Sequence, residues 1–116
     1  MATFTKAILS GSTSGKGVPV VAIATAGTLI HTAVAGASAL DEIWLYAVNT
    51  SSSSVKLTIE FGGASAPADN IEVVVLPEAG LVTVIPGLLL NGALTVKAFA
   101  GTASVVTVHG FVNKIA

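Results

Sequence analysis

The chain of 116 residues is 53% hydrophobic but only 9% charged, against about 25% charged in an ordinary soluble domain. This composition excludes a monomer covered by charges in the usual way, so we expect other subunits to cover part of its surface. The five lysines are scattered, arginine is absent and the net charge is −1, which argues against nucleic-acid binding. Cysteine is also absent, as suits a protein made in a reducing cytoplasm.

The N-terminal part of the chain is predicted to be an arm or short strand followed by a flexible loop. Phe4–Leu9 has the composition of a short strand, which could also reach a neighbouring molecule. Ser10–Gly17 superficially looks like a phosphate-binding loop, which needs Gly, four residues and then Gly-Lys-Ser/Thr. Ser10 stands where the first glycine is required and Gly17 where the hydroxyl is required, so we interpret this segment as a surface loop.

Two long segments free of charged residues raise the question of a membrane span. Gly17–Leu40 and Ala79–Val96 both contain proline and glycine, and neither holds an unbroken apolar stretch of about 18 residues. We therefore expect no membrane-spanning helix. Instead, Val18–Ala24 and Leu29–Val34 are predicted to be strands, the first with Pro19 at its start or on a sheet edge.

Leu40–Gly63 is predicted to be a central β-hairpin against which the other strands pack. Its first half, Glu42–Asn49, fits a helix or a strand, but its aromatic and branched residues favour a strand covered on both sides. The polar segment Thr50–Ser54 is a loop, and the second half alternates clearly. In that second strand we expect Val55, Leu57, Ile59 and Phe61 to point inward, and Lys56, Thr58 and Glu60 to point outward.

The rest of the chain reads as two further strand pairs and a last strand. A turn at Pro77–Gly80 and a two-residue turn at Asn91-Gly92 each predict an antiparallel reversal. The predicted strands are Ile71–Leu76, Leu81–Ile85, Leu88–Leu90, Leu94–Ala100 and Val105–Val112, followed by a tail at Asn113–Ala116. A total of about nine or ten short strands indicates an all-β, antiparallel sandwich or barrel. We expect residues 18–116 to form this single domain, with residues 1–17 as its arm and loop.

No residue type occurs in a pattern that points to catalysis, a cofactor or a metal. His31 and His109 lie on different predicted strands without further ligands at zinc spacing. A Ser-His-Asp triad has no local signature. Asp41 and Glu42 are adjacent and must point to opposite faces of a strand. We expect the carboxylates to be solvated at strand ends, namely Asp41, Glu42, Glu60, Asp69, Glu72 and Glu78.

Aromatic residues leave one alternative open. Trp44 and Tyr46 could stack on sugar rings if they were exposed, but their place in the most apolar run favours core packing. A small sugar-binding β-sandwich is therefore the alternative to a structural role. Asn49-Thr50-Ser51 matches a glycosylation sequon, which carries little weight here because the N-terminus lacks the pattern of a signal peptide.

Three segments together resemble small structural proteins in the virions of tailed bacteriophages. They are ALDEIWLYAVNTSSSSVKLTIEFGG (39–63), LPEAGLVTVIPGLLLNGALTVKAFA (76–100) and SVVTVHGFVNKI (104–115). The resemblance extends over about Ile30–Ile115 and lies in the order of strands and turns. Gly92-Ala93-Leu94 stands where such chains often carry Gly-Asp before the strand.

The resemblance implies a jelly-roll-like β-sandwich on the outside of a capsid or in a tail. The expected function is that of a capsid decoration (cement) protein, made in the host cytoplasm and located on the capsid surface. It would act as a homo-oligomer, expected to be a trimer, that contacts the major capsid protein or other virion proteins. A tail or head-fibre component is the alternative within this class. No enzymatic activity, cofactor, nucleic acid or membrane is expected.

Overall fold

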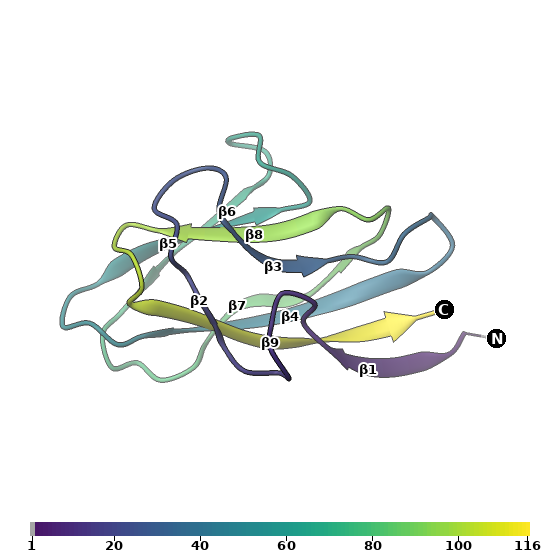
Figure 1. Cartoon of the computed structure of the whole chain (residues 1–116), viewed down its shortest axis with the longest axis horizontal. Coiled ribbons are helices and arrows are strands. Elements are labelled where there is room, and N and C mark those ends of the chain that lie inside the picture. The colour runs from purple at the N-terminus through teal and green to yellow at the C-terminus, as the bar shows by residue number, and fades with distance from the viewer. Residues whose placement is uncertain (1) are drawn as a thin grey trace.

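Two antiparallel β-sheets packed face to face form the structure, a computed structural model that describes residues 2–116 (Figure 1). These residues contain nine strands and no helix, hence no helix long and apolar enough to cross a membrane. The all-β prediction is confirmed. The strands are β1 (Phe4–Ile8), β2 (Val18–Pro19), β3 (Thr28–Thr32), β4 (Leu40–Asn49), β5 (Val55–Phe61), β6 (Asn70–Val75), β7 (Val82–Leu90), β8 (Thr95–Ala100) and β9 (Val106–Ile115).

The strand order is that of a jelly roll. The first sheet runs β1-β9-β4-β7, with β2 also paired to β9, and the second runs β3-β8-β5-β6. β1 and β2 lie one after the other along the same edge of β9. β1 pairs with the C-terminal half of β9 and β2 with its N-terminal end, so together they act as one edge strand. The two sheets then hold four positions each, as in the eight-stranded double Greek key. In Figure 1, β3 and β8 lie above β9, β4 and β1.

The core lies between the sheets and is made by alternate residues of each strand. β4 shows this most clearly, because every second residue from Asp41 to Asn49 is buried. Each fully buried Leu, Ile or Val side chain contributes about 1.5–3 kcal/mol relative to leaving it exposed. Core residues that are completely buried include Ile30, Ile43, Leu45, Leu57, Ile59, Val75, Ile85, Val96, Val106, Val108 and Val112.

The predicted central hairpin at Leu40–Gly63 is wrong, because β4 and β5 lie in different sheets. Thr50–Ser54 carries the chain from one sheet to the other. The turns at Pro77–Gly80 and Asn91-Gly92 likewise join strands of different sheets, not antiparallel neighbours. Turn residues reverse the chain locally, whereas the pairing partner is decided by which inner faces can meet across the core.

Several predicted strand bounds also change. β2 covers only Val18–Pro19 of the predicted Val18–Ala24, because the chain then leaves β9 to cross to the second sheet. β7 continues through Pro86, which an edge strand tolerates because its outer side needs no amide proton, and its register against β4 shifts there. β9 includes most of the predicted tail at Asn113–Ala116, since β1 and β4 pair with it on both sides.

The predicted N-terminal strand forms and pairs within the same chain. β1 runs antiparallel to β9, with Phe4 opposite Ile115 and Ile8 opposite Phe111. Thr3 and Ala116 extend this pairing through reciprocal backbone hydrogen bonds, so the two ends of the chain lie side by side (Figure 1). Phe4–Ile8 therefore belongs to the same sandwich as the rest of the chain.

The outer faces of β4 and β5 differ from expectation in opposite ways. Thr58 and Glu60 were predicted to point into solvent, yet both are buried. The segment between β2 and β3 folds over Glu60, which accepts hydrogen bonds from Thr25 and Gly27. The strand β4 was predicted to be covered on both sides, but its outer residues are only half-buried. Those outer residues are Leu40, Glu42, Trp44, Tyr46 and Val48.

Candidate functional site

A buried polar cluster joins the two sheets. Asp41 of β4 accepts hydrogen bonds from His31 Nε2 of β3 at 2.8 Å and from Lys114 Nζ of β9 at 3.0 Å. It also accepts one from the backbone amide of Val34 at 3.2 Å. The Asp41 and His31 side chains are 0% and 2% exposed. The prediction that Asp41 is a solvated strand-end carboxylate is wrong, because donors from β3, from the loop after β3 and from β9 converge on it and make its burial possible.

The hydrogen bonds of His31 define its role. The backbone amide of Ser10 donates to Nδ1 at 3.0 Å, so Nε2 carries the proton that is donated to Asp41. The Ser10 hydroxyl oxygen accepts a hydrogen bond from the Thr32 amide at 2.7 Å and presents no proton to the imidazole. His31 and Asp41 are therefore a structural tie between the sheets, and Ser10 contacts the imidazole through its backbone amide.

Asp41 is held as a carboxylate. Burial raises its pKa, but the hydrogen bonds from His31 and Lys114 and the positive charge of Lys114 outweigh this, so the pKa lies below its ordinary value. A group whose pKa is lower in the folded protein stabilises it above the unfolded pKa. That contribution is lost as the pH falls through the folded pKa.

We therefore expect acid to weaken the protein through Asp41. Urea unfolding followed between pH 7 and pH 2 should show a free energy of unfolding that falls once the pH drops below about 4. In Asp41→Asn, which cannot titrate at this position, the fall should be smaller. An equally steep acid dependence in Asp41→Asn would contradict the assignment.

Two other buried polar side chains, Glu60 and Asn49, form hydrogen bonds that hold loops in place. Glu60 accepts hydrogen bonds from Thr25 Oγ1 at 2.8 Å and from the Gly27 amide at 2.7 Å, which fixes the segment that covers β5. Asn49 donates to the carbonyls of Ser53 and Val75, and its Oδ1 accepts from the Ser51 amide. The sequon asparagine is therefore 2% exposed and fully hydrogen-bonded, a poor acceptor for a glycan.

The outer face of the first sheet gathers four aromatic side chains, which we call the aromatic face: Trp44, Tyr46, His109 and Phe111. Trp44 pairs directly with Phe111 across β4 and β9, and Tyr46 pairs with His109, so all four rings share one side of the sheet. The prediction that Trp44 and Tyr46 pack in the core is wrong. The alternation of β4 gives the inner positions to Ile43, Leu45 and Ala47, which leaves the even-numbered residues outside.

A row of polar side chains borders the rings. Glu42 Oε1 accepts hydrogen bonds from Trp44 Nε1 at 2.7 Å and from Asn113 Nδ2 at 2.8 Å. These bonds lower the pKa of Glu42 below its ordinary value and hold the indole in place. Lys6 Nζ lies 5.1 Å from the centroid of the Phe111 ring, within the range of a cation–π contact.

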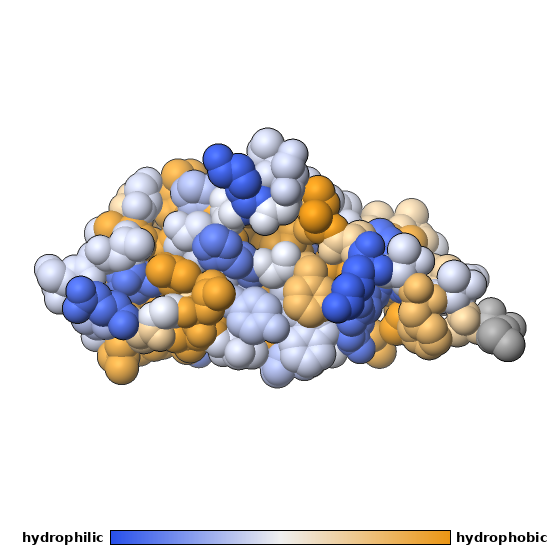
Figure 2. Space-filling model, turned by 90° about the horizontal axis from the view of Figure 1, so that it is seen from below, coloured by the Kyte–Doolittle hydropathy of each residue, from blue (hydrophilic) through white to orange (hydrophobic). Residues whose placement is uncertain are grey.

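Two glycines let rings lie against the backbone. A Cβ atom at Gly87 would come within 2.8 Å of Trp44 Cζ2, and one at Gly17 within 2.6 Å of His109 Cε1. The Trp44 and Phe111 ring planes differ by only 10°, with centroids 6.2 Å apart. Figure 2 views the molecule from below Figure 1, and ring-shaped side chains are seen nearly face-on in its centre. The Trp44 and Phe111 ring planes are thus nearly parallel.

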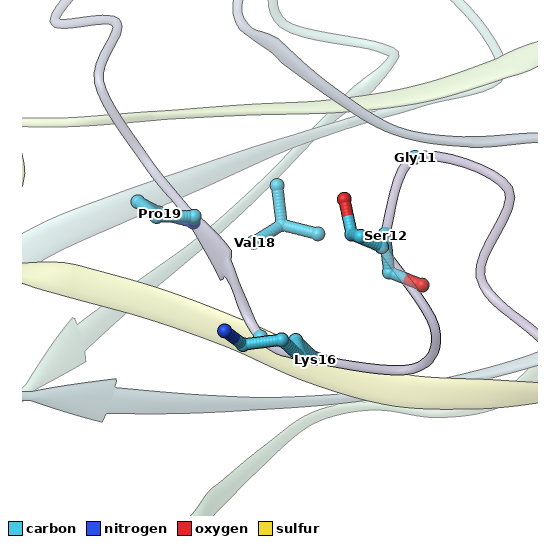
Figure 3. Close-up of a pocket in the computed structure, with 7 residues that line it drawn as sticks. Gly11, Ser12, Lys16, Val18 and Pro19 are labelled. Atoms are coloured by element: carbon cyan, nitrogen blue, oxygen red, sulfur yellow. The ribbon is translucent and has the colours of Figure 1, made fainter.

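A cavity of about 370 Å³ lies inside the loop between β1 and β2 (Figure 3). Its lining is formed by the seven residues Gly11, Ser12, Thr13, Lys16, Gly17, Val18 and Pro19. Ser12 turns its hydroxyl back to the Leu9 carbonyl at 2.7 Å, and Lys16 is the one charged group in the lining. The backbone amides of Gly11, Ser12 and Lys16 are already hydrogen-bonded to carbonyl oxygens, so these three do not donate to a phosphate in this loop. Within residues 2–116, no three His, Asp or Glu side chains are placed to hold a metal ion.

Comparisons with protein-family models, with curated proteins and with solved structures found no match. The functional argument therefore depends on the residues themselves. Sequence reasoning missed the partners that complete the two clusters, Lys114 in one and Phe111 and Asn113 in the other. The aromatic face did have a sequence signal, because Trp44 and Tyr46, like His109 and Phe111, are two residues apart and so share a face.

Proposed function

We propose that this chain is a structural protein of a tailed-phage virion, acting as a capsid decoration protein. It would stabilise the head by contacts with copies of itself, as a homotrimer, and with the major capsid protein. The observation that supports this proposal most strongly is a jelly roll with a charge-poor, apolar surface. Jelly rolls recur in viral capsid proteins, although the same architecture also serves lectins and other proteins. The resemblance in residues 39–63, 76–100 and 104–115 supports the same proposal.

The exposed apolar side chains support burial against other subunits. Isolated apolar side chains are normal on a protein surface, but three of them are close in sequence at the end of β6 and in the following loop. Val74 is 58% exposed, Leu76 57% and Leu81 62%. In a chain with 9% charged residues, we expect this segment to be covered by another molecule.

The sheet edges differ in how well they could accept a neighbour. β7 carries Pro86 and two register shifts against β4, and β3 has one register shift against β8. These features discourage pairing with another strand. β6 pairs with β5 in an unbroken register from Asn70 to Val75, so its outer edge is regular. We expect β6 and the loop after it to make the subunit contact, and many copies on a shell to add avidity.

Light scattering coupled to size exclusion tests the oligomer. The wild-type protein should elute with a mass three times 11.4 kDa. The double variant Leu76→Ser/Leu81→Ser should dissociate, because it replaces two apolar contacts by hydroxyls. Leu29→Ser, at a side chain 42% exposed on β3, is the matched control and should leave the trimer intact. A wild-type monomer would contradict the proposal.

Electron microscopy of purified particles tests the location. Antibody labelling should decorate the capsid surface at regular positions. Labelling confined to the tail would replace the decoration role by a tail role. Recovery of the protein only as free molecules in the lysate would contradict a virion role altogether.

A further inference from the structure

We propose that the aromatic face binds a neutral polysaccharide, with Trp44, Tyr46 and Phe111 stacking on sugar rings and the polar row bonding their hydroxyls. This goes beyond the structural role proposed above and does not depend on it, because the surface belongs to the single chain. The face lies on the first sheet, whereas the expected subunit contact lies at β6 on the second.

The first reason is the shape of the surface. The Trp44 and Phe111 ring planes are within 10° of each other, and Gly87 lets the indole lie down on the backbone of β7. Figure 2 shows ring-shaped side chains in the middle of this side of the molecule. The face of an aromatic ring carries a partial negative charge, so it attracts the C–H groups that line one side of a pyranose ring.

The second reason is that the rings are fixed before any ligand arrives. Trp44 Nε1 donates a hydrogen bond to Glu42, and the Phe111 ring lies between the indole and the Lys6 side chain. Both are half-buried on paired strands of the sheet, not on loops. Binding to such a surface costs little side-chain entropy, which matters for a ligand that makes weak individual contacts.

The third reason is the placement of charge, which favours a sugar over a protein partner. Lys6, Asn113 and Glu42 are direct neighbours across three strands and form one row over the face. An apolar partner would bury a cation and a carboxylate in this row at a high desolvation cost. Sugar hydroxyls both donate and accept, so they can bond all three groups. The opposite charges of Lys6 and Glu42 balance, which favours a neutral ligand.

The single tryptophan of the chain gives a direct measurement. Trp44 fluorescence is titrated with hexamers of β-1,4-linked glucose and of β-1,4-linked N-acetylglucosamine, up to about 10 mM, a range suited to millimolar affinity. We expect a saturable change with at least one hexamer. Phe111→Ala should weaken binding about tenfold, since it removes one stacking ring.

Phe99→Ala is the matched control, because Phe99 is half-buried on β8 of the other sheet. It should bind like wild type, and thermal melting checks that both variants are folded. No response to either hexamer would overturn the proposal, as would equal binding by Phe111→Ala and wild type. A loss of oligomer mass in Phe111→Ala would also overturn it, because the face would then be a subunit contact. The oligomer and particle experiments can fail without affecting this result.

Discussion

Replacing Asp41 with alanine should lower the free energy of unfolding by about 3–5 kcal/mol, the effect expected when one partner of a buried ion pair is removed. Three donors would lose their acceptor at once. His31 Nε2 would keep a buried N–H group without a partner and the Val34 amide a partly buried one, whereas Lys114, whose side chain is 43% exposed, could turn to water. Because His31 lies on the second sheet, the variant also releases a tie across the core.

Urea denaturation at pH 7 measures this loss, with the exposed ion pair of the second sheet as control. Lys56 and Glu72 are 3.0 Å apart, but their side chains are 57% and 52% exposed. Glu72→Ala should therefore cost less than about 1 kcal/mol. If the two variants lost equal stability, the buried cluster would not be the tie described above.

Replacing Gly110 with alanine should cost at least about 2–3 kcal/mol, because a tightly packed site must move to admit the added methyl group. Gly110 stands opposite Leu45, where β9 approaches β4 closely. A Cβ atom there would overlap the Trp44 carbonyl oxygen and come within 3.1 Å of Leu45 Cδ2. The obstructing atom is backbone, so relief requires the two central strands of the first sheet to separate.

Gly101→Ala is the control for this substitution. Gly101 is exposed, and a Cβ atom added there would lie 4.0 Å from the Lys56 carbonyl oxygen, an ordinary van der Waals distance. We expect a change within about 0.5 kcal/mol, as is usual for exposed positions. Thermal melting of both variants gives the comparison. A Gly110→Ala protein that melts like wild type would show that β4 and β9 can move apart at little cost.

Most strands could be predicted because their signals are local. The alternation in Val55–Phe61 and the β-branched content around Glu42–Asn49 predict strands that the structure contains. The pairing could not be predicted in the same way. Asn91-Gly92 is a strong signal for a hairpin, yet it connects strands of different sheets, because a turn does not decide which strand lies alongside.

The same division applies to the candidate sites. Adjacent Asp41 and Glu42 had to point to opposite sides, and they do: one enters the buried cluster and the other joins the polar row of the aromatic face. Which side is the core depends on the opposite sheet. Lys114 is 73 residues from Asp41 in the sequence, and Asn113 is 71 residues from Glu42. No local sequence pattern predicts either partner.

By itself, the sequence determined that this chain is built of strands, that few charges protect its surface and that no familiar catalytic or metal-binding pattern is present. These properties follow from composition and from the two-residue period of a strand, which each segment carries alone. Only the tertiary structure decided that Trp44 faces outward, that Asp41 is buried and that the strands follow a jelly-roll order. Those outcomes arise from contacts between segments far apart in the chain, because a strand acquires an inside only when a second sheet covers it.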